Sequence, residues 1–184
     1  MTKYVAMLRG ININGHKIIK MERLRAAFVK MGFHNVRTYI ASGNVVFETE
    51  EPAAGLSKKI HDAILKDFGY EVHVVTKSAK EMAAIVKRNP LVKNKAVDQS
   101  RLYVTFLSDD PPRGAPGLLE PLLMGEEQVH IVGRAAYLYC PKGYHETKLN
   151  NNVIEKKLSC NATTRNWNTT KTLLEMASES GGGQ

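Results

Sequence analysis

The sequence has few cysteines, one tryptophan and no long hydrophobic run. Its 184 residues contain only two cysteines, Cys140 and Cys160, which are too few for a disulfide-based fold. Because this cysteine usage fits a reducing compartment, we expect a cytoplasmic protein. No uninterrupted apolar stretch approaches the roughly 18 residues of a membrane-spanning helix. The first residues enter a strand-like pattern at once, so we expect neither a signal peptide nor a membrane partner.

Motifs for metal, nucleotide and acyl chemistry are also scarce. The six histidines have no short paired spacing and there is no Cys-x-x-Cys, so neither a metal nor a cofactor is expected. Ser42 lacks the Gly-x-Ser-x-Gly context of a nucleophilic serine. Gly10 and Gly15 are spaced as in a phosphate-binding P-loop, but His16 stands where that motif has lysine. Two interpretations of this loop stay open, a looser anion site and a simple tight turn.

Acidic residues are in the minority. The chain carries 26 Lys and Arg against 18 Asp and Glu, which gives a net charge of +8. This balance indicates an anionic partner without identifying it. Hydrophobic residues make up 43% and charged residues 24%, a composition typical of a globular domain rather than a disordered chain.

Hydrophobic periodicity in the first half predicts a ferredoxin-like unit. The expected elements are strand 4–8, helix 21–31, strand 36–40, a turn at 41–44, strand 45–47, a helix from Pro52 to 68, and strand 71–76. This β-α-β-β-α-β order is that of the split βαβ arrangement.

The pattern then restarts after a connecting helix at 78–89. We expect a strand at 102–107, a helix at 116–124, a hairpin of 129–132 and 135–140, and a helix at 148–159. A further helix at about 165–177 is expected in place of the last strand. The predicted fold class is therefore α+β, with two tandem ferredoxin-like halves. The predicted boundaries are 1–77, a connecting segment 78–100, 101–178, and a flexible tail 179–184.

Both faces of the first strand are apolar. Tyr4, Ala6 and Leu8 alternate with Val5 and Met7. Because a ferredoxin-like sheet leaves one face open, the second half or a second copy of the chain should cover it. An oligomer formed through this open face is therefore possible.

Polar and basic residues that suit a ligand-binding site gather at three places. The topology brings the loop after the first strand to the same sheet edge as the first hairpin tip, and loops at such an edge often carry function. The third place is a cluster near residue 165, where a helix start and an arginine suit an anion. The candidate ligand-binding residues are Arg9, Gly10, Asn12, Asn14, Lys17, Ser42, Gly43, Asn44, Thr164, Arg165 and Asn166.

Three motifs taken together resemble a family of bacterial proteins catalogued as a domain of unknown function. They are Leu8-Arg9-Gly10-Ile11-Asn12, Ser42-Gly43-Asn44-Val45-Val46-Phe47 and Thr163-Thr164-Arg165-Asn166-Trp167. The resemblance extends from the first strand to about residue 177. It implies a tandem of two ferredoxin-like halves and brings no established activity, cofactor or substrate.

The sequence leaves three functional hypotheses. The first is a binding protein that holds an anionic ligand between its two halves, either a nucleic acid or a phosphorylated or carboxylated metabolite. The second is a small enzyme acting on a phosphate-bearing or acyl substrate, in which Arg9 and Arg165 stabilise negative charge and His16 moves a proton. The third makes the motifs architectural. Tyr103, Tyr137 and Tyr139 are interpreted as sheet packing rather than as a base-stacking surface.

Overall fold

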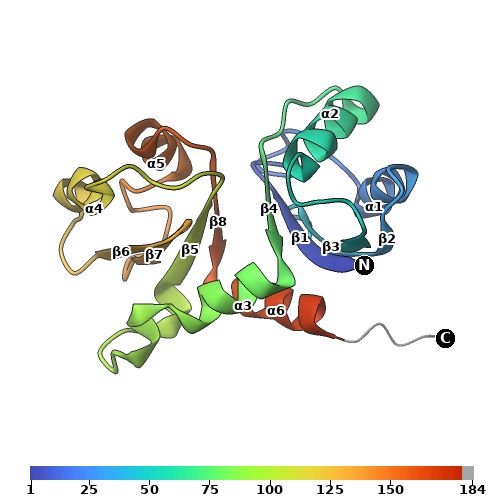
Figure 1. Cartoon of the computed structure of the whole chain (residues 1–184). Coiled ribbons are helices and arrows are strands. Elements are labelled where there is room, and N and C mark those ends of the chain that lie inside the picture. Colours follow the sequence, from blue (N-terminus) through green and yellow to red (C-terminus); the bar gives the residue numbers. More distant parts are fainter. Residues whose placement is uncertain (180–184) are drawn as a thin grey trace. The chain divides into compact units, whose positions relative to one another are not determined.

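The computed structural model of the chain describes residues 1–179 and contains two compact units (Figure 1). Unit 1 consists of Met1–Ala83 together with the chain from Thr172, and unit 2 consists of Ala84–Lys171. The helices α3 (Ala79–Lys87) and α6 (Trp167–Ser178) contribute residues to both units. Among the described residues, no helix combines the length and apolarity needed to cross a bilayer.

Unit 1 has the predicted ferredoxin-like topology. Its elements are β1 (Thr2–Leu8), α1 (Met21–Lys30), β2 (His34–Tyr39), β3 (Asn44–Thr49), α2 (Leu56–Phe68) and β4 (Val74–Ser78). The four strands form an antiparallel sheet in the order β2-β3-β1-β4. Strand β3 therefore lies between β1 and β2, as the split βαβ arrangement requires.

Unit 2 repeats this topology after two short 3₁₀ turns. The turns are η1 (Pro90–Lys93) and η2 (Gln99–Arg101). The elements that follow are β5 (Leu102–Leu107), α4 (Ala115–Leu119), the 3₁₀ turn η3 (Glu120–Leu122), β6 (Gln128–Val132), β7 (Ala135–Tyr139), α5 (Asn151–Leu158) and β8 (Ala162–Asn166). Its sheet order, β6-β7-β5-β8, matches that of unit 1 element for element.

The two sheets also share their register. Leu8 of β1 lies opposite Val74 of β4, and Leu107 of β5 lies opposite Ala162 of β8. In each case the last residue of the central strand faces the first residue of the fourth strand. Residues that end equivalent strands can therefore be compared position by position between the units.

Each unit buries one sheet face against its own two helices. In unit 1, Tyr4, Ala6 and Leu8 pack into one core with residues of α1 and α2. In unit 2, Leu107 and Leu138 do the same with residues of α4 and α5. Alternate strand residues on one face and helix residues spaced along one side form each core, which is the packing that the hydrophobic periodicity predicts.

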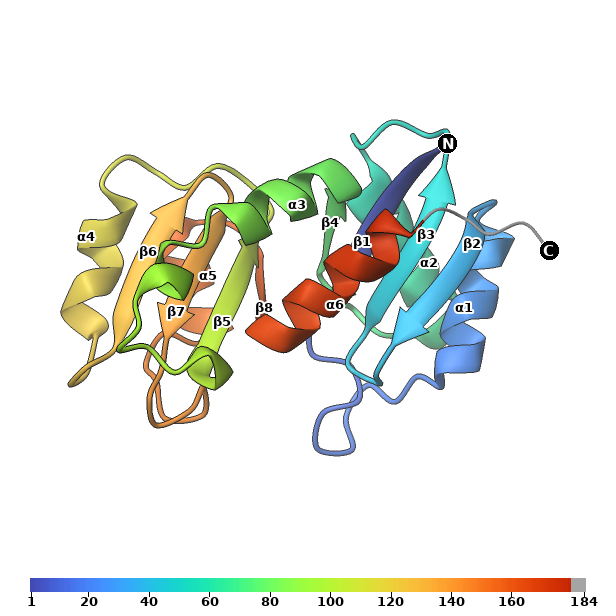
Figure 2. The same ribbon diagram turned by 90° about the horizontal axis from the view of Figure 1, so that it is seen from below.

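The opposite face of each sheet is covered by a segment from elsewhere in the chain. Val5 and Met7 are fully buried, and the part of α6 that belongs to unit 1 crosses this face (Figure 2). Arg37 on β2 fastens that part by donating to the Met176 carbonyl, at 2.5 Å. In unit 2 the Tyr137 hydroxyl donates to the Ile85 carbonyl at 2.6 Å, which places the end of α3 against the sheet. The described part of α6 therefore lies on the face of unit 1 for which the sequence analysis expected a cover from the second half or from a second copy of the chain.

The tyrosines of unit 2 belong to the sheet packing. Tyr137 is fully buried and Tyr139 is 8% exposed, whereas Tyr103 is partly buried and packs against Tyr144 with 5.3 Å between ring centroids. Because the rings of Tyr137 and Tyr139 are buried, neither offers a face to a nucleotide base. Tyr137 and Tyr139 are therefore not available to stack nucleotides in the way that the sheet aromatics of RNA-recognition domains do.

The expected fold class is confirmed, but one detail of it is wrong. The last helix does not replace the fourth strand of the second half, because β8 is present and α6 starts directly after it at Trp167. Asn166 ends the strand and caps the helix, since its Oδ1 accepts the Thr169 N–H at 2.8 Å. The strand was missed because its five residues, Ala-Thr-Thr-Arg-Asn, do not alternate between apolar and polar side chains.

Several element boundaries also differ from the prediction. Helix α2 begins at Leu56 rather than at Pro52, because a turn intervenes. Helix α5 begins at Asn151 rather than at residue 148, because the Asn150 side chain caps it by accepting the Val153 N–H. Strand β4 occupies Val74–Ser78 instead of 71–76. The tail expected at 179–184 lies outside the described residues beyond Glu179.

Candidate functional site

The structure places the eleven candidate ligand-binding residues in two groups. Eight of them lie at one end of the unit 1 sheet, on the β1–α1 loop (residues 9–20) and at the β2–β3 turn (residues 40–43) with the adjoining start of β3. The other three lie on β8 of unit 2. The two loops of unit 1 are called the edge loops below. Figure 2 shows the β1–α1 loop protruding beyond the strand ends.

The β1–α1 loop is a small hairpin rather than an open coil. Ile13 and His16 form an isolated β-bridge, and the Asn12 N–H donates to the Lys17 carbonyl at 3.1 Å. Asn14 and Gly15 between them have φ angles of 49° and 77°. Positive φ at both central residues is typical of a type I′ hairpin turn, for which Asn-Gly is the favoured pair. The tip of the loop is thereby held away from the sheet and exposed to solvent.

The side chain of Asn12 joins the two edge loops. Its amide Nδ2 donates to the Ala41 carbonyl at 2.7 Å and to the Ile19 carbonyl at 2.9 Å. Its Oδ1 accepts the Ile19 N–H at 2.8 Å. One side chain thus ties the start of the loop to its end and to the neighbouring turn. The topology predicted that these two segments lie at the same sheet edge, and these contacts confirm it.

Gly43 and Asn44 hold the β2–β3 turn against the end of β1. The Gly43 carbonyl accepts the Leu8 N–H at 2.8 Å, and Gly43 has a φ of +82°. A Cβ atom at Gly43 would lie 2.8 Å from the Leu8 Cβ, so only glycine fits. Asn44 is fully buried, and its Nδ2 donates to the Tyr39 carbonyl and to the Ser42 Oγ. The Ser42-Gly43-Asn44 motif therefore holds the turn in place.

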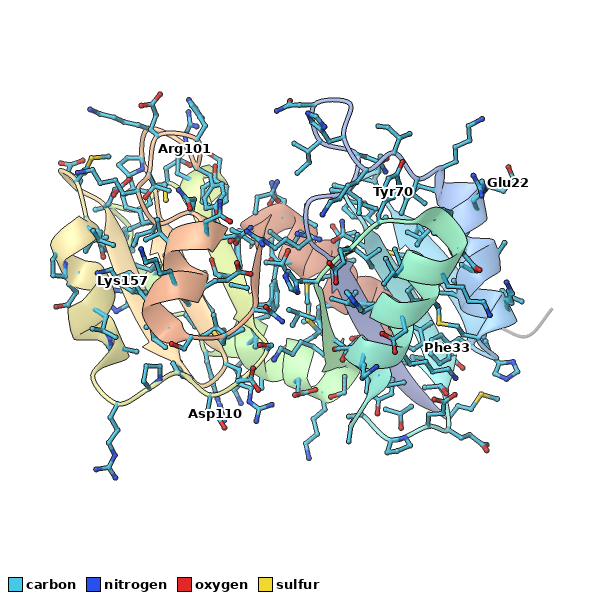
Figure 3. The ribbon with its side chains drawn as sticks, turned by 90° about the horizontal axis from the view of Figure 1, so that it is seen from above. Glu22, Phe33, Tyr70, Arg101, Asp110 and Lys157 are labelled. Atoms are coloured by element: carbon cyan, nitrogen blue, oxygen red, sulfur yellow. The ribbon has the colours of Figure 1, made fainter. Side chains whose placement is uncertain are left out.

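A third segment, at the start of β4, completes this end of unit 1. The Lys17 Nζ donates to the Glu71 carbonyl at 2.6 Å, and the Arg9 N–H donates to the His73 carbonyl at 2.9 Å. The side chain of His73 is exposed, and its ring lies 6.5 Å from that of His61. Figure 3 shows Tyr70 and Glu22 toward the same end of the unit, with Phe33 toward the other.

The charge of the chain is concentrated in the segment that builds this edge. Residues 1–47 contain eight Lys and Arg but one acidic residue, Glu22, whereas the rest of the chain contains 18 basic and 17 acidic residues. The first segment thus accounts for +7 of the net charge of +8. Sequence reasoning treated the positive charge as a property of the whole chain, although this local imbalance is visible in the sequence.

Three of these eight basic side chains are neutralised by an acidic partner. The pairs are Lys3–Glu48 at 3.8 Å, Lys30–Asp67 at 3.0 Å and Arg37–Glu179 at 2.5 Å. Within residues 1–179, the basic side chains of the loop and of the first turns of α1 form no such ion pair at Lys17, Lys20, Arg23 and Arg25. Four basic side chains without an ion pair therefore lie at the end of unit 1 that the edge loops form, where Glu22 and Glu71 are the nearby acidic residues.

Backbone strain is concentrated on the edge loops as well. Among the described residues, six other than glycine have a positive φ, and four of these are on the edge loops: Asn12, Asn14, Lys17 and Ile40. A positive φ is unfavourable for Lys17 and strongly unfavourable for the β-branched Ile40, at 48° and 47°. Strained residues of this kind cluster at functional sites. No motif in the sequence indicates this feature.

The edge loops carry three exposed isoleucines. Ile13, Ile18 and Ile40 are 52%, 53% and 53% exposed, and they are three of the eight large apolar side chains exposed in the described part of the chain. Ile13 follows Asn12 in the sequence. Ile18 and Ile40 precede Ile19 and Ala41, the two residues whose carbonyls accept from the Asn12 amide. All three exposed isoleucines thus belong to the edge loops, and the sequence analysis did not identify them.

The second group of candidate residues has structural contacts inside unit 2. The Thr164 hydroxyl donates to the Asn151 Oδ1 at 2.7 Å. It also contacts the Thr105 hydroxyl at 2.7 Å and accepts from the Tyr144 hydroxyl at 3.1 Å. This network fastens β8 to its neighbours. The start of α6 is capped by the Asn166 side chain.

Arg165 is buried, with 9% of its surface exposed. Its Nη1 donates to the Thr163 Oγ1 at 2.8 Å and to the Thr164 carbonyl at 2.9 Å. Burial lowers the pKa of the guanidinium to about 10, and the nearby Tyr144 acts in the opposite direction. The binding role assigned to Thr164, Arg165 and Asn166 stays a prediction.

The corresponding sheet end of unit 2 repeats the backbone contacts of unit 1 with different side chains. The Leu107 N–H donates to the Arg134 carbonyl at 3.0 Å, and the Ser108 N–H donates to the Asn161 carbonyl at 2.9 Å. These bonds are equivalent to the bonds in unit 1 from the Leu8 N–H to the Gly43 carbonyl and from the Arg9 N–H to the His73 carbonyl. A shallow cavity of about 540 Å³ lies at this end, with both acidic and basic side chains in its lining, including Asp109, Glu155 and Lys156. This end of unit 2 thus has the same backbone contacts as unit 1, but with acidic as well as basic side chains in place of the basic β1–α1 loop.

The two cysteines are not joined by a disulfide and differ in burial. Burial, with a smaller contribution from Glu127, raises the pKa of the Cys140 thiol to about 12, so this thiol stays protonated and unreactive at neutral pH. Cys160 is half-buried. Within residues 1–179, no group of three or more His, Cys, Asp or Glu side chains is placed to hold a metal ion.

Comparison with solved structures identifies a relative of the same architecture. The chain is similar to the conserved bacterial protein SP0830 from Streptococcus pneumoniae, with a TM-score of 0.75 and 22% sequence identity. The similarity covers 96% of this chain and 98% of the other. At this identity the likeness shows a common fold. No curated protein matches the sequence.

The first two of the three sequence motifs lie inside a family match. Residues 1–137 match the family described as "Protein of unknown function (DUF1697)", a range that covers all of unit 1 up to Ala83 and the first part of unit 2. The Thr163–Trp167 motif lies beyond the matched range. The resemblance to a family of unknown function, based on the motifs, is thereby confirmed. The chain belongs to the family described as Protein of unknown function (DUF1697).

Proposed function

We propose that the protein binds an anionic partner through the edge loops of unit 1. The observation that carries this proposal is the local excess of positive charge. Lys17 and Lys20 on the loop, with Arg23 and Arg25 on the first turns of α1, form no ion pair within residues 1–179. Positive charge gathered on one surface raises the local concentration of anions and favours their binding.

The backbone of the loops supports the same proposal. An exposed loop without a function has no reason to keep Lys17 and Ile40 at positive φ, because each such residue is less stable there than in an ordinary conformation. The hydrogen bonds of Asn12 maintain this conformation. In this proposal Asn12, Gly43 and Asn44 are positioning residues that hold the loops.

The residues that contact the anion are then those that the loops expose. Asn14 lies at the exposed tip of the hairpin, and Arg9 lies half-buried at its base. Lys17 is exposed just after the tip, where its Nζ also donates to the Glu71 carbonyl. Lysine and arginine side chains and backbone N–H groups are the usual donors to phosphate and carboxylate oxygens. Gly10 is exposed and has an open surface around its Cα, so a ligand can approach the backbone closely there.

A charge-removing double variant tests the proposal. Replacing Lys17 and Lys20 by glutamine should weaken binding of a fluorescein-labelled oligothymidylate by about 10-fold at low salt, measured by fluorescence anisotropy, because two phosphate contacts are lost. The dependence of log K on log salt concentration should become shallower by about 0.7 for each lost contact.

The control removes the same charge from exposed lysines of α5. Lys156→Gln with Lys157→Gln should leave the affinity within about twofold, since these residues belong to a helix of unit 2. Equal weakening by both double variants would mean that net charge, not the edge loops, determines binding. Failure of the wild-type protein to bind either the oligonucleotide or inorganic polyphosphate at low salt would overturn the proposal.

A further inference from the structure

We infer that the anionic partner of the edge loops is a single-stranded nucleic acid, an inference that rests on the proposed function and specifies the class of ligand. The feature that points to it is the group of Ile13, Ile18 and Ile40 on the edge loops, each more than half exposed, beside Lys17. A phosphate or carboxylate group alone gives apolar side chains nothing to contact. A nucleic acid offers both phosphates for the lysines and base faces for the isoleucines.

The edge loops carry apolar and charged side chains close together in the sequence. Ile13 and Ile18 flank the hairpin tip, and Lys17 lies between them in sequence. Ile40 comes from the neighbouring turn, which Asn12 ties to the loop through the Ala41 carbonyl. Single exposed apolar side chains are ordinary on protein surfaces, but here three occur on two loops that one asparagine side chain joins.

The conformation of Ile40 adds an independent reason. A β-branched residue with a φ of 47° is strained, and a glycine or asparagine would occupy this turn position more easily. An exposed isoleucine there brings neither turn stability nor burial to the isolated protein. Its side chain becomes useful when a partner covers it.

The protruding loop favours single strands over duplex. In a duplex the base faces are stacked, and an apolar side chain reaches them only after a base step has been unstacked. In a single strand the bases are accessible, and binding commonly combines a positive groove with aromatic side chains that contact successive bases. In this inference the exposed isoleucines of the edge loops take the place of those aromatic side chains. The sheet faces take no part, because both are covered within their own units.

The experiment compares three probes of similar charge on the full chain: a labelled oligothymidylate, inorganic polyphosphate as a competitor, and a labelled DNA duplex. The test variant is Ile13→Ser with Ile18→Ser, and the matched control is Val29→Ser, an exposed apolar residue of α1. We expect the wild-type protein to bind the oligothymidylate more tightly than polyphosphate or duplex. The double isoleucine variant should bind the oligothymidylate about 10-fold more weakly, with an unchanged salt dependence and an unchanged affinity for polyphosphate.

The outcomes separate this inference from the proposed function. Equal affinity for oligothymidylate and polyphosphate, with no effect of the isoleucine substitutions, would overturn the inference and leave the anion site standing. Tighter binding of duplex would also overturn it. Loss of a wild-type dimer in the isoleucine variant, measured by sedimentation, would assign these isoleucines to the contact with a second copy of the chain. Absence of binding to any of the three probes would overturn the proposed function itself. An unchanged melting temperature confirms that each variant is folded.

Discussion

Gly43→Ala should lower the free energy of unfolding by about 2–5 kcal/mol. Two penalties act together at this position. Any residue other than glycine is strained by about 1–2 kcal/mol at its φ of +82°. The new Cβ would also lie 2.8 Å from the Leu8 Cβ, and overpacking of this kind costs about 1–3 kcal/mol. Urea denaturation measures the change.

Gly15→Ala is the matched control for this substitution. Gly15 has a similar φ of +77°, but nothing lies within 4 Å of the position that its Cβ would take. It should therefore show the conformational penalty alone, about 1–2 kcal/mol. If both variants lost the same stability, the close contact between the β2–β3 turn and the end of β1 would not contribute as described.

Arg165→Ala is expected to have the second large effect, a loss of about 1–3 kcal/mol in the absence of any ligand. The guanidinium is buried and donates to the Thr163 hydroxyl and the Thr164 carbonyl, so its removal leaves both acceptors without that donor. Thermal unfolding gives the change, because each kcal/mol shifts the melting temperature by about 2–4 °C in a chain of this size.

Two further variants locate the cause. Arg165→Lys keeps the charge but cannot reproduce the planar arrangement of donors, so an intermediate loss is expected. Asn166→Ala removes the cap of α6, which should lower stability by about 0.5–2 kcal/mol without touching the guanidinium. If Arg165→Ala left the melting temperature unchanged, the arginine would have no structural role, and the predicted ligand role of the Thr164–Asn166 cluster would gain support.

Much of the fold can be predicted from local pattern. The alternation in Tyr4–Leu8, the helical spacing from Met21 and the Gly133-Arg134 turn each indicate the element that is observed. These signals are clear because each lies within one element, as an apolar run, a helical spacing of apolar side chains or a turn pair. Strand β8 gives no such signal, since its stability comes from pairing with β5 and from the Thr164 hydroxyl network.

The covering of the sheet faces is a non-local property. The α6 sequence shows an amphipathic helix, but nothing in it indicates that residues from Thr172 belong to unit 1. The bond from Arg37 to the Met176 carbonyl joins residues 139 positions apart. Periodicity reports which side of a helix is buried and not which surface it is buried against.

The candidate site, like the fold, could be predicted from the sequence only in part. The proximity of the two edge loops follows from strand order, and Asn12 and Gly43 are prominent because Asn and Gly cluster in turns. Their roles as supports for the loops could not be read from residue type, since the same residues suit a ligand site and a tight turn equally well. The strained φ of Lys17 and Ile40 is invisible in the sequence, because neither residue type favours a positive φ.

The edge loops can be tested most directly by mapping where an anion binds. Backbone amide signals of the ¹⁵N-labelled protein would be followed by NMR during titration with inorganic tripolyphosphate. The account predicts that the largest changes occur at residues 9–20 and 40–43, and that the equivalent end of unit 2, around Ser108 and Asn161, is unaffected. Changes concentrated on α5 or at the Thr164–Asn166 cluster, with the edge loops unaffected, would contradict it.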